Sequence, residues 1–414
     1  MIWIVGGGLA GLSAAVALAE QGRKVTLLEG APQAGGRCRS YFDPVLGQTI
    51  DNGNHLVLSG NTSVQAYLRS IGASDALAGP DRAVFDFVDV RSDKRWTIRP
   101  NDSALAWWIF AKDRRVPDTA PSDYLVLVKL LLAGGDKRID EVIACKGPLW
   151  DRLLQPFLLA VLNTEPEASS AKLAGAVIAE SLAKGGARYR PRIAHPTLAA
   201  AFVDPALKFL AANGADVHLG QRVRALGFEG ERLASLQLPS ETISVAAGDS
   251  VILAVPPWVA TELVPGLTAP TEFRSIVNGH FKLPRPAGAP LMTGVIGGAA
   301  EWIFAFDDRI SITVSGADAI VDDDREALAK RFWADVAKVF HLGPDLPPWQ
   351  IVKERRATFA ATPAQARLRP PPRTRWSNLL LAGDWTDTGL PSTIEGAVRS
   401  GHKAAALALA RSSL

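Results

Sequence analysis

The first 30 residues constrain the fold more than any other part of the chain. An apolar run from Ile2 to Val5 leads directly into a segment in which Gly6, Gly8 and Gly11 fit the pattern G-x-G-x-x-G. In such a segment the first glycine permits a tight turn, the second lets backbone N–H groups approach a pyrophosphate, and the third lets a helix pack closely on the strand. The phosphate then lies at the helix N-terminus, where unpaired amides and the helix dipole favour an anion. The pattern therefore predicts a dinucleotide site.

The residues that follow complete this unit. Residues 12–20 read as a helix closed by Gly22, and residues 24–28 read as a second strand that ends at Glu29. A carboxylate at this point can accept hydrogen bonds from ribose hydroxyls. A glycine pattern alone is often only a flexible loop, but strand, helix and acid together predict an α/β protein with a Rossmann-like domain.

A second glycine segment bears on the choice between FAD and NAD. Gly35, Gly36 and Arg37 follow the second strand closely, so their amides and guanidinium can meet the same pyrophosphate, as an extended flavin cradle requires. No second fingerprint follows, because residues 294–298 have the wrong spacing and the glycine pair at 185–186 lacks the flanking pattern. We therefore expect no separate NAD(P)H domain, and electrons must come from another donor or from the substrate.

The C-terminal end supplies a complementary segment. Residues 378–382 read as a buried strand that leads into Gly383 and Asp384. A helix follows, with Ser392 or Thr393 as its predicted N-cap, and its N-terminus is suited to stabilise negative charge on a reduced flavin ring. The alternative is a final strand and helix that only complete the sheet.

Composition excludes several other classes of function. The 45 basic and 42 acidic residues are too evenly balanced for a protein that binds nucleic acid through phosphates. The 2 cysteines and 6 histidines are scattered without metal-ligand spacing, so we expect no metal site. The N-terminus lacks a basic region and reads as a strand, which favours a cytoplasmic protein. No apolar run reaches the ~18 residues of a spanning helix, so any membrane contact is expected to be peripheral.

These motifs occur in the order found in the flavin amine oxidase and phytoene desaturase superfamily, which the sequence resembles at both ends, including the stretch 395–397. Within it, the chain is most similar to the squalene-associated desaturase-like family, the hydroxysqualene dehydroxylases of hopanoid synthesis. Residues 50–56, 148–150 and 159–164 carry this resemblance. The chain departs from the family at Asn54, where glutamine is expected.

The resemblance implies roles for three residues. Asn54 and His55 are expected beside the isoalloxazine, with His55 as proton donor and Asn54 orienting a hydroxyl, and Val223 is expected to offer backbone contacts to adenine. Without the resemblance, residues 51–55 read as a polar turn that carries a hydrogen-bonded histidine.

The resemblance also implies a discontinuous, amine oxidase-like organisation. Residues 1–84, 191–264 and 371–414 would form the FAD-binding domain, and residues 85–190 and 265–370 an α+β substrate domain. Paired tryptophans, basic residues and a short apolar helix in residues 105–132 suit a segment that lies among lipid headgroups. An ordinary buried helix with its loop is the alternative.

The leading functional prediction is reductive removal of the hydroxyl of hydroxysqualene, with hydride from reduced FAD, to give squalene. Such an enzyme would work at the inner face of the cytoplasmic membrane. A carotenoid-type desaturase and a flavin amine oxidase are the alternatives, and a non-catalytic binder of prenyl chains is a remote one. The sequence leaves the electron donor and the oligomeric state open.

Overall fold

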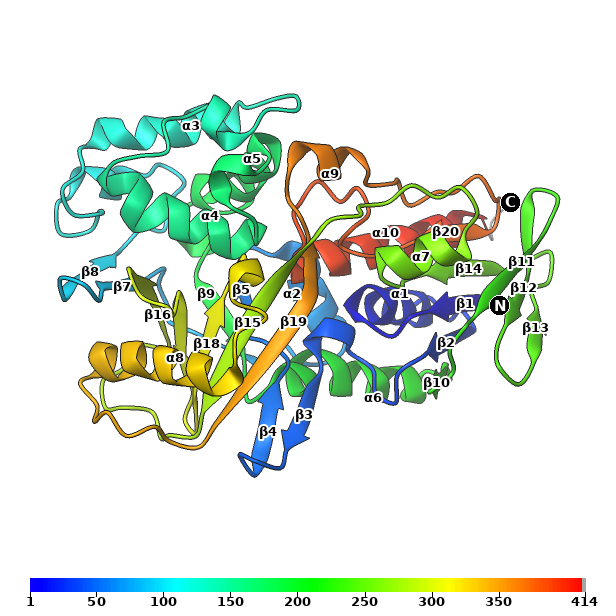
Figure 1. Ribbon diagram of the computed structural model, residues 1–414. Coiled ribbons are helices and arrows are strands. Elements are labelled where there is room, and N and C mark those ends of the chain that lie inside the picture. Colours follow the sequence, from blue (N-terminus) through cyan, green and yellow to red (C-terminus); the bar gives the residue numbers. More distant parts are fainter. Residues whose placement is uncertain (412–414) are drawn as a thin grey trace.

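The computed structural model describes residues 1–411. A five-stranded parallel sheet, in the order β10-β2-β1-β14-β20, forms one half of the molecule (Figure 1). Its strands are β1 (Ile2–Val5), β2 (Val25–Glu29), β10 (Asp216–Leu219), β14 (Ser250–Leu253) and β20 (Leu379–Leu381). The inner strands are continuous apolar runs, as expected for parallel strands that helices cover on both faces. The connections diverge on either side of β1, which is where ligands bind in open parallel sheets.

Two helices from opposite ends of the chain pack together beside this sheet. They are α1 (Leu9–Ala19) and α10 (Ile394–Arg411). A β-carbon at Gly401 would lie 2.2 Å from the carbonyl oxygen of Ala10, so only glycine allows this close approach. Helix α1 starts at Leu9, three residues earlier than predicted, because the glycine pattern itself forms its first turn.

The other half of the molecule is built on a seven-stranded mixed sheet, ordered β19-β15-β18-β17-β16-β7-β8. Its strands are β7 (Phe85–Asp89), β8 (Lys94–Ile98), β15 (Phe273–Phe281), β16 (Met292–Ile296), β17 (Trp302–Ala305), β18 (Ile310–Val314) and β19 (Trp349–Phe359). Helix α8 (Arg325–Phe340) packs on one face. Aromatic side chains of the opposite face share a core with a group of helices that includes α3 (Leu125–Leu131), α4 (Gln155–Leu162) and α5 (Ala171–Glu180).

Shorter elements connect the two halves (Figure 1). The hairpin of β3 (Ser40–Asp43) and β4 (Gln48–Asp51) leads into β5 (Leu56–Leu58), which pairs with β9 (Pro191–Ala194), and β9 pairs also with β6 (Leu77–Ala78). Helix α2 (Thr62–Ser70) and helix α6 (Asp204–Ala212) complete this region. The sheet of β11 (Ala225–Glu229), β12 (Arg232–Gln237) and β13 (Thr242–Ser244) lies at the far end of the parallel sheet.

The predicted α/β class is confirmed, with a Rossmann-like parallel sheet in one half and a mixed sheet in the other. We propose the domain limits given above, since the segments 1–84, 191–264 and 371–414 contain all five strands of the parallel sheet. The segments 85–190 and 265–370 contain all seven strands of the mixed sheet.

Candidate active site

The glycine turn after β1 has the shape of a phosphate cradle. Gly6 has a φ of +110°, and a β-carbon there would lie 2.4 Å from the Ala254 carbonyl oxygen. A β-carbon at Gly11 would lie 1.9 Å from the carbonyl oxygen of Gly6. In contrast, a β-carbon at Gly8 would meet nothing within 4 Å. The turn is therefore closed on its protein side and open at Gly8, at the N-terminus of α1, where a pyrophosphate fits.

Glu29 lies at the end of β2, beside the same turn. Its Oε2 accepts a hydrogen bond from the Gly7 amide at 2.5 Å, and its Oε1 accepts one from the Ala31 amide at 2.7 Å. The Gln221 amide donates to the Glu29 carbonyl oxygen at 2.8 Å and so brings the segment with the buried Val223 to this edge. The predicted ribose and adenine residues thus lie next to each other.

The second glycine segment lies directly against the first. The Gly35 amide donates to the Gly7 carbonyl oxygen at 2.8 Å, and a β-carbon at Gly36 would lie 3.3 Å from the Gly8 α-carbon. Both Gly35 and Gly36 have positive φ angles, of +104° and +56°. The two glycine segments therefore form one continuous backbone surface.

Arg37 connects this surface to the C-terminal segment. Its guanidinium forms an ion pair with Asp384 at 2.6 Å and donates to the Ala357 carbonyl oxygen at 2.5 Å. Burial alone would lower the pKa of Arg37, but the charge of Asp384 and the hydrogen bond to it outweigh burial and raise that pKa. Gly383, which precedes Asp384, has a φ of +149°, and a β-carbon there would collide with the Trp385 indole. Two predicted cofactor segments, 347 residues apart in sequence, thus meet at Arg37 and Asp384.

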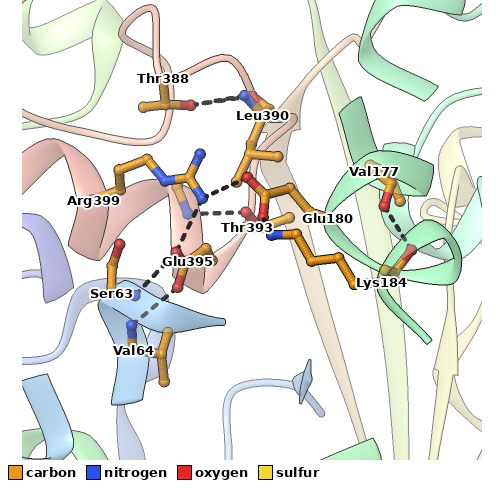
Figure 2. Close-up of polar contacts among 12 residues, drawn as sticks. Ser63, Val64, Val177, Glu180, Lys184, Thr388, Leu390, Thr393, Glu395 and Arg399 are labelled. Atoms are coloured by element: carbon orange, nitrogen blue, oxygen red, sulfur yellow. Dashed lines mark hydrogen bonds and ion pairs between the residues drawn. The ribbon is translucent and has the colours of Figure 1, made fainter. Parts of the chain in front are cut away.

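Thr393 caps the helix that follows. Its Oγ1 accepts a hydrogen bond from the Gly396 amide at 3.0 Å, which makes Thr393, rather than its neighbour Ser392, the N-cap of α10. Figure 2 shows how this end of α10 is held. The buried Glu395 carboxylate accepts hydrogen bonds from the amides of Ser63 and Val64, in the first turn of α2.

Arg399 extends this contact to the substrate half of the molecule. Its guanidinium lies 3.1 Å from Glu395 and 3.1 Å from Glu180 of α5 (Figure 2). Lys184 pairs with Glu180 from the other side at 2.5 Å. The N-terminus of α10 is therefore fixed to elements of both halves.

Asn54 and His55 lie between β4 and β5, where the two halves meet. The Asn54 Nδ2 donates to Thr313 Oγ1 at 3.1 Å and to the Ile312 carbonyl oxygen at 3.4 Å, while its buried Oδ1 has no hydrogen-bond partner. Burial lowers the pKa of His55 to about 4, and the positive charge of Arg37 acts in the same direction. His55 is therefore a neutral imidazole at neutral pH, close to the pair of Arg37 and Asp384.

Both residues line a small cavity that we call the inner pocket. Its walls are mostly apolar, with one buried carboxylate. The lining residues are Asp51, Asn54, His55, Ile193, Ala194, Leu198, Phe304 and Phe306. The inner pocket has a volume of about 10 Å³, which is room for a single hydroxyl group or water, and its one free acceptor marks where such a group would bind.

Sequence reasoning missed part of this pocket. Asp51 stood within the polar stretch that we singled out, but it was given no role. Phe304 and Phe306 alternate along β17 and the turn after it, a pattern that shows one common face without showing what that face contacts. Arg309, which stacks on Phe306 at 3.9 Å, gave no signal in the sequence.

Within residues 1–411, no group of three or more His, Cys, Asp or Glu side chains is placed to hold a metal ion. No helix in the same range is both long and apolar enough to cross a membrane.

Comparisons with known proteins agree with this geometry. Residues 9–409 match the family described as flavin containing amine oxidoreductase. The chain is 52% identical to a hydroxysqualene dehydroxylase of Rhodopseudomonas palustris, over 99% of this chain and 98% of that protein. It is 50% identical to the protein of the same name from Sinorhizobium fredii, with 99% and 98% covered. A probable zeta-carotene desaturase of Synechococcus elongatus is 23% identical, with 97% of each chain covered.

Solved structures show the same fold at much lower identity. A putrescine oxidase double mutant superposes with a TM-score of 0.71 at 16% identity, over 99% of this chain and 98% of that one. A putative protoporphyrinogen oxidase from Exiguobacterium gives a TM-score of 0.69 at 17% identity, with 99% and 98% covered. The glycine cradle, open at Gly8 and bordered by Glu29 and Arg37, fits FAD. The chain is an FAD-dependent oxidoreductase of the flavin containing amine oxidoreductases and belongs, within them, to the hydroxysqualene dehydroxylase family.

Proposed function

We propose that this enzyme removes the hydroxyl group of hydroxysqualene reductively and releases squalene and water. The names of relatives at 52% and 50% identity support this assignment. The observation that carries it is the free Oδ1 of Asn54 in the inner pocket, next to His55 and the pair of Arg37 and Asp384. A buried acceptor without a partner favours a ligand that donates a hydrogen bond to it. The hydroxyl of an isoprenoid alcohol is such a donor.

The chemistry sets three tasks for the protein. Loss of an allylic hydroxyl as water leaves a delocalised carbocation, and bound reduced FAD supplies the hydride that quenches it. The amide of Asn54 accepts the hydrogen bond of the hydroxyl and so fixes the carbon–oxygen bond in one orientation. Phe304 and Phe306 line the pocket and exclude water that would otherwise trap the cation, and an aromatic ring such as that of Phe304 can stabilise the positive charge.

For His55 we propose a more limited part than that of the proton donor expected from the resemblance. Because its pKa is lowered to about 4, the imidazole carries no extra proton at neutral pH. We propose that His55 contacts the reacting hydroxyl through a ring nitrogen. The test is His55→Ala in protein that retains FAD, and unchanged turnover of hydroxysqualene would remove His55 from the mechanism.

The substrate is proposed to arrive from a membrane surface. Three apolar side chains in this region are largely exposed: Leu132 to 80%, Leu105 to 79% and Phe110 to 69%. Leu132 directly follows α3, Phe110 lies in the turn at 107–110, and Leu105 lies just before that turn (Figure 1, cyan). Exposed basic side chains at Lys112 and Lys129 lie in the same stretch. Apolar side chains among lysines suit the headgroup region of an anionic bilayer.

Vesicle binding tests this surface. The double variant Leu105→Ser, Leu132→Ser should lose most of its co-sedimentation with vesicles of anionic phospholipid, without a change in melting temperature. The double variant Phe42→Ser, Val45→Ser, at the equally exposed hairpin of β3 and β4, is the matched control. Equal loss in both double variants would assign no special role to α3.

Product analysis tests the reaction. The flavin of the purified protein is reduced anaerobically, hydroxysqualene is added, and flavin reoxidation and squalene are followed together. We expect one squalene for each flavin reoxidised. A flavin that stays reduced, with no squalene, would exclude dehydroxylation and direct attention to oxidation of isoprenoids, the activity that the name of the Synechococcus relative states.

A further inference from the structure

A second, larger cavity lies on the other side of the inner pocket wall. This outer cleft has a volume of about 610 Å³ and lies beside the hairpin of β3 and β4. Ser40 and Arg309 line the outer cleft, and Asp51 lines the inner pocket. Ser40 and Arg309 both contact Asp51 directly. The carboxyl group of Asp51 is therefore the point at which the two cavities meet.

The contacts of Asp51 leave it buried but not isolated. Its Oδ1 accepts hydrogen bonds from Ser40 Oγ at 2.6 Å and from the Leu198 amide at 2.9 Å. Its Oδ2 lies 3.4 Å from Arg309, a longer contact than an ideal ion pair. The side chain of Asp51 is 4% exposed and that of Arg309 is 3% exposed.

Arg309 closes the wall between the cavities. Its guanidinium stacks on the ring of Phe306 at 3.9 Å and pairs with Asp308 at 3.0 Å. Its Nε is buried and has no hydrogen-bond partner. One residue thus contacts an aromatic wall of the inner pocket, a carboxylate of the outer cleft, and Asp51 between them.

We propose that Asp51 delivers the proton that turns the leaving hydroxyl into water, and that the outer cleft connects Asp51 to solvent. This inference rests on the proposed function. The carbon–oxygen bond breaks with both electrons on oxygen, and the oxygen takes the proton of Asp51 and leaves as water. Bound reduced FAD would supply the hydride that this carbon gains, and with it the two electrons of the reduction. Asp51 regains a proton from water in the outer cleft through the hydroxyl of Ser40.

The surroundings of Asp51 act on its pKa in both directions. Burial raises the pKa of Asp51, although the hydrogen bonds from Ser40 and Leu198 and the charge of Arg309 oppose the change. Other titratable groups near this site are His55 in the inner pocket, Asp308 on the far side of Arg309, His280 on β15, and Cys38 beside Arg37. Burial lowers the pKa of His280 to about 3 and raises that of Cys38 to about 12, so both are neutral at neutral pH. Arg309 is the charged partner that Asp51 contacts directly, and Asp51 is the carboxylate that lines the inner pocket.

Two substitutions and a matched control test the proposal. Asp51→Asn removes the acidic proton and keeps the size of the side chain, and Asp51→Glu restores the acid. Asp43→Asn is the control, because Asp43 is equally buried, accepts hydrogen bonds from two amides, and lines neither cavity. The measurement is the single-turnover rate at which hydroxysqualene reoxidises the reduced flavin, across a range from about pH 5 to about pH 9.

We expect Asp51→Asn to retain FAD and to slow this rate by about 100-fold or more, which is the usual size of a general-acid contribution. The wild-type rate should fall as pH rises, and the variant should lose that dependence. Asp51→Glu should recover part of both, and Asp43→Asn should behave as wild type. Ser40→Ala keeps the acid but removes its link to the cleft, and a loss of about 10-fold is expected.

Three results would overturn the relay. The first is a single-turnover rate for FAD-bound Asp51→Asn that lies within about threefold of the wild-type rate, because a general acid contributes more than that. The second is an equal loss in Asp43→Asn, which would indicate a structural effect. The third applies if Asp51→Asn fails to retain FAD: unchanged rate and pH profile in Ser40→Ala would then exclude the route through the cleft. Wild-type protein that forms no squalene would instead refute the proposed function, and the relay with it.

Discussion

The cofactor cradle and the inner pocket lie side by side but are built in different ways. The cradle consists mainly of backbone: two glycine segments in contact, with Glu29 and Asp384 already paired to an amide and to Arg37. The inner pocket consists of side chains, and one polar atom, Asn54 Oδ1, has no partner. At the sites we propose, recognition of the cofactor would thus depend on chain conformation, and recognition of the substrate would depend on which side chains face the gap.

The largest effect should come from filling the cradle. Gly8→Val places its side chain where the protein itself has no atom within 4 Å, at the φ of −73° that any residue adopts. The fold should therefore persist while FAD affinity falls by about 100-fold or more, since the pyrophosphate loses its close backbone contacts. Flavin content and melting temperature of the apoprotein measure the two effects.

Gly11→Ala is the control for this experiment. Its β-carbon would lie 1.9 Å from the Gly6 carbonyl oxygen, so the apoprotein itself should melt at a lower temperature. If Gly8→Val bound FAD as wild type does, the cradle could not lie at the N-terminus of α1.

The next effect should come from the inner pocket. Asn54→Leu keeps the volume of the side chain but removes the acceptor, and turnover of hydroxysqualene should fall roughly 10- to 100-fold with FAD still bound. Thr313→Val is the control for the donor side of Asn54, because it removes the hydroxyl that the Asn54 amide donates to, together with that hydroxyl's own bond to Asn278, and leaves Oδ1 in place. Equal losses in the two variants would mean that Asn54 acts only by supporting β18.

The same contrast explains how much the sequence could reveal. The cradle was predictable because a turn that admits only glycine leaves a local pattern, and Gly6, Gly11 and Gly35 all adopt the conformations or close contacts that the pattern requires. The capping choice between Ser392 and Thr393 needed the structure, since both side chains are chemically able to cap.

The inner pocket was only partly predictable. Asn54 and His55 came from family resemblance, and the residues that oppose them belong to β9, β17 and the turn after it, far away in sequence. Alternating aromatics at Phe304 and Phe306 predict a strand with one buried face, but pairing across the sheet decides what that face contacts. Arg309 gave no signal because a lone arginine in a turn is normally exposed.

A smaller effect concerns the dry interior behind the pocket. His280 is fully buried and its pKa is lowered to about 3, so below its ordinary pKa of 6.5 the unfolded chain takes up a proton that the folded chain does not. Stability therefore falls as pH falls, by about 1.4 kcal/mol for each pH unit from this histidine. His280→Asn should reduce the slope of unfolding free energy between pH 6.5 and about pH 5 by that amount.

Chemical denaturation at several pH values measures this slope. His218 is the control, since it lies exposed at the edge of the parallel sheet, and His218→Asn should leave the slope unchanged. An unchanged slope in His280→Asn would mean that water reaches His280 and that this part of the interior is not closed to solvent.

The smallest effect should come from the contact that joins the two regions. Arg399 lies between Glu395 of α10 and Glu180 of α5 at 3.1 Å from each, and its side chain is 31% exposed (Figure 2). Because solvent weakens such a pair, Arg399→Met should lower the unfolding free energy by about 1 kcal/mol or less. Arg367→Met is the control, since its pair with Asp136 is more exposed and should contribute close to nothing.

If Arg399 instead only anchors the end of α10, FAD affinity should fall in Arg399→Met while the unfolding free energy of the apoprotein stays constant. A loss of stability with unchanged FAD affinity would show that the contact joins the two halves without shaping the cradle.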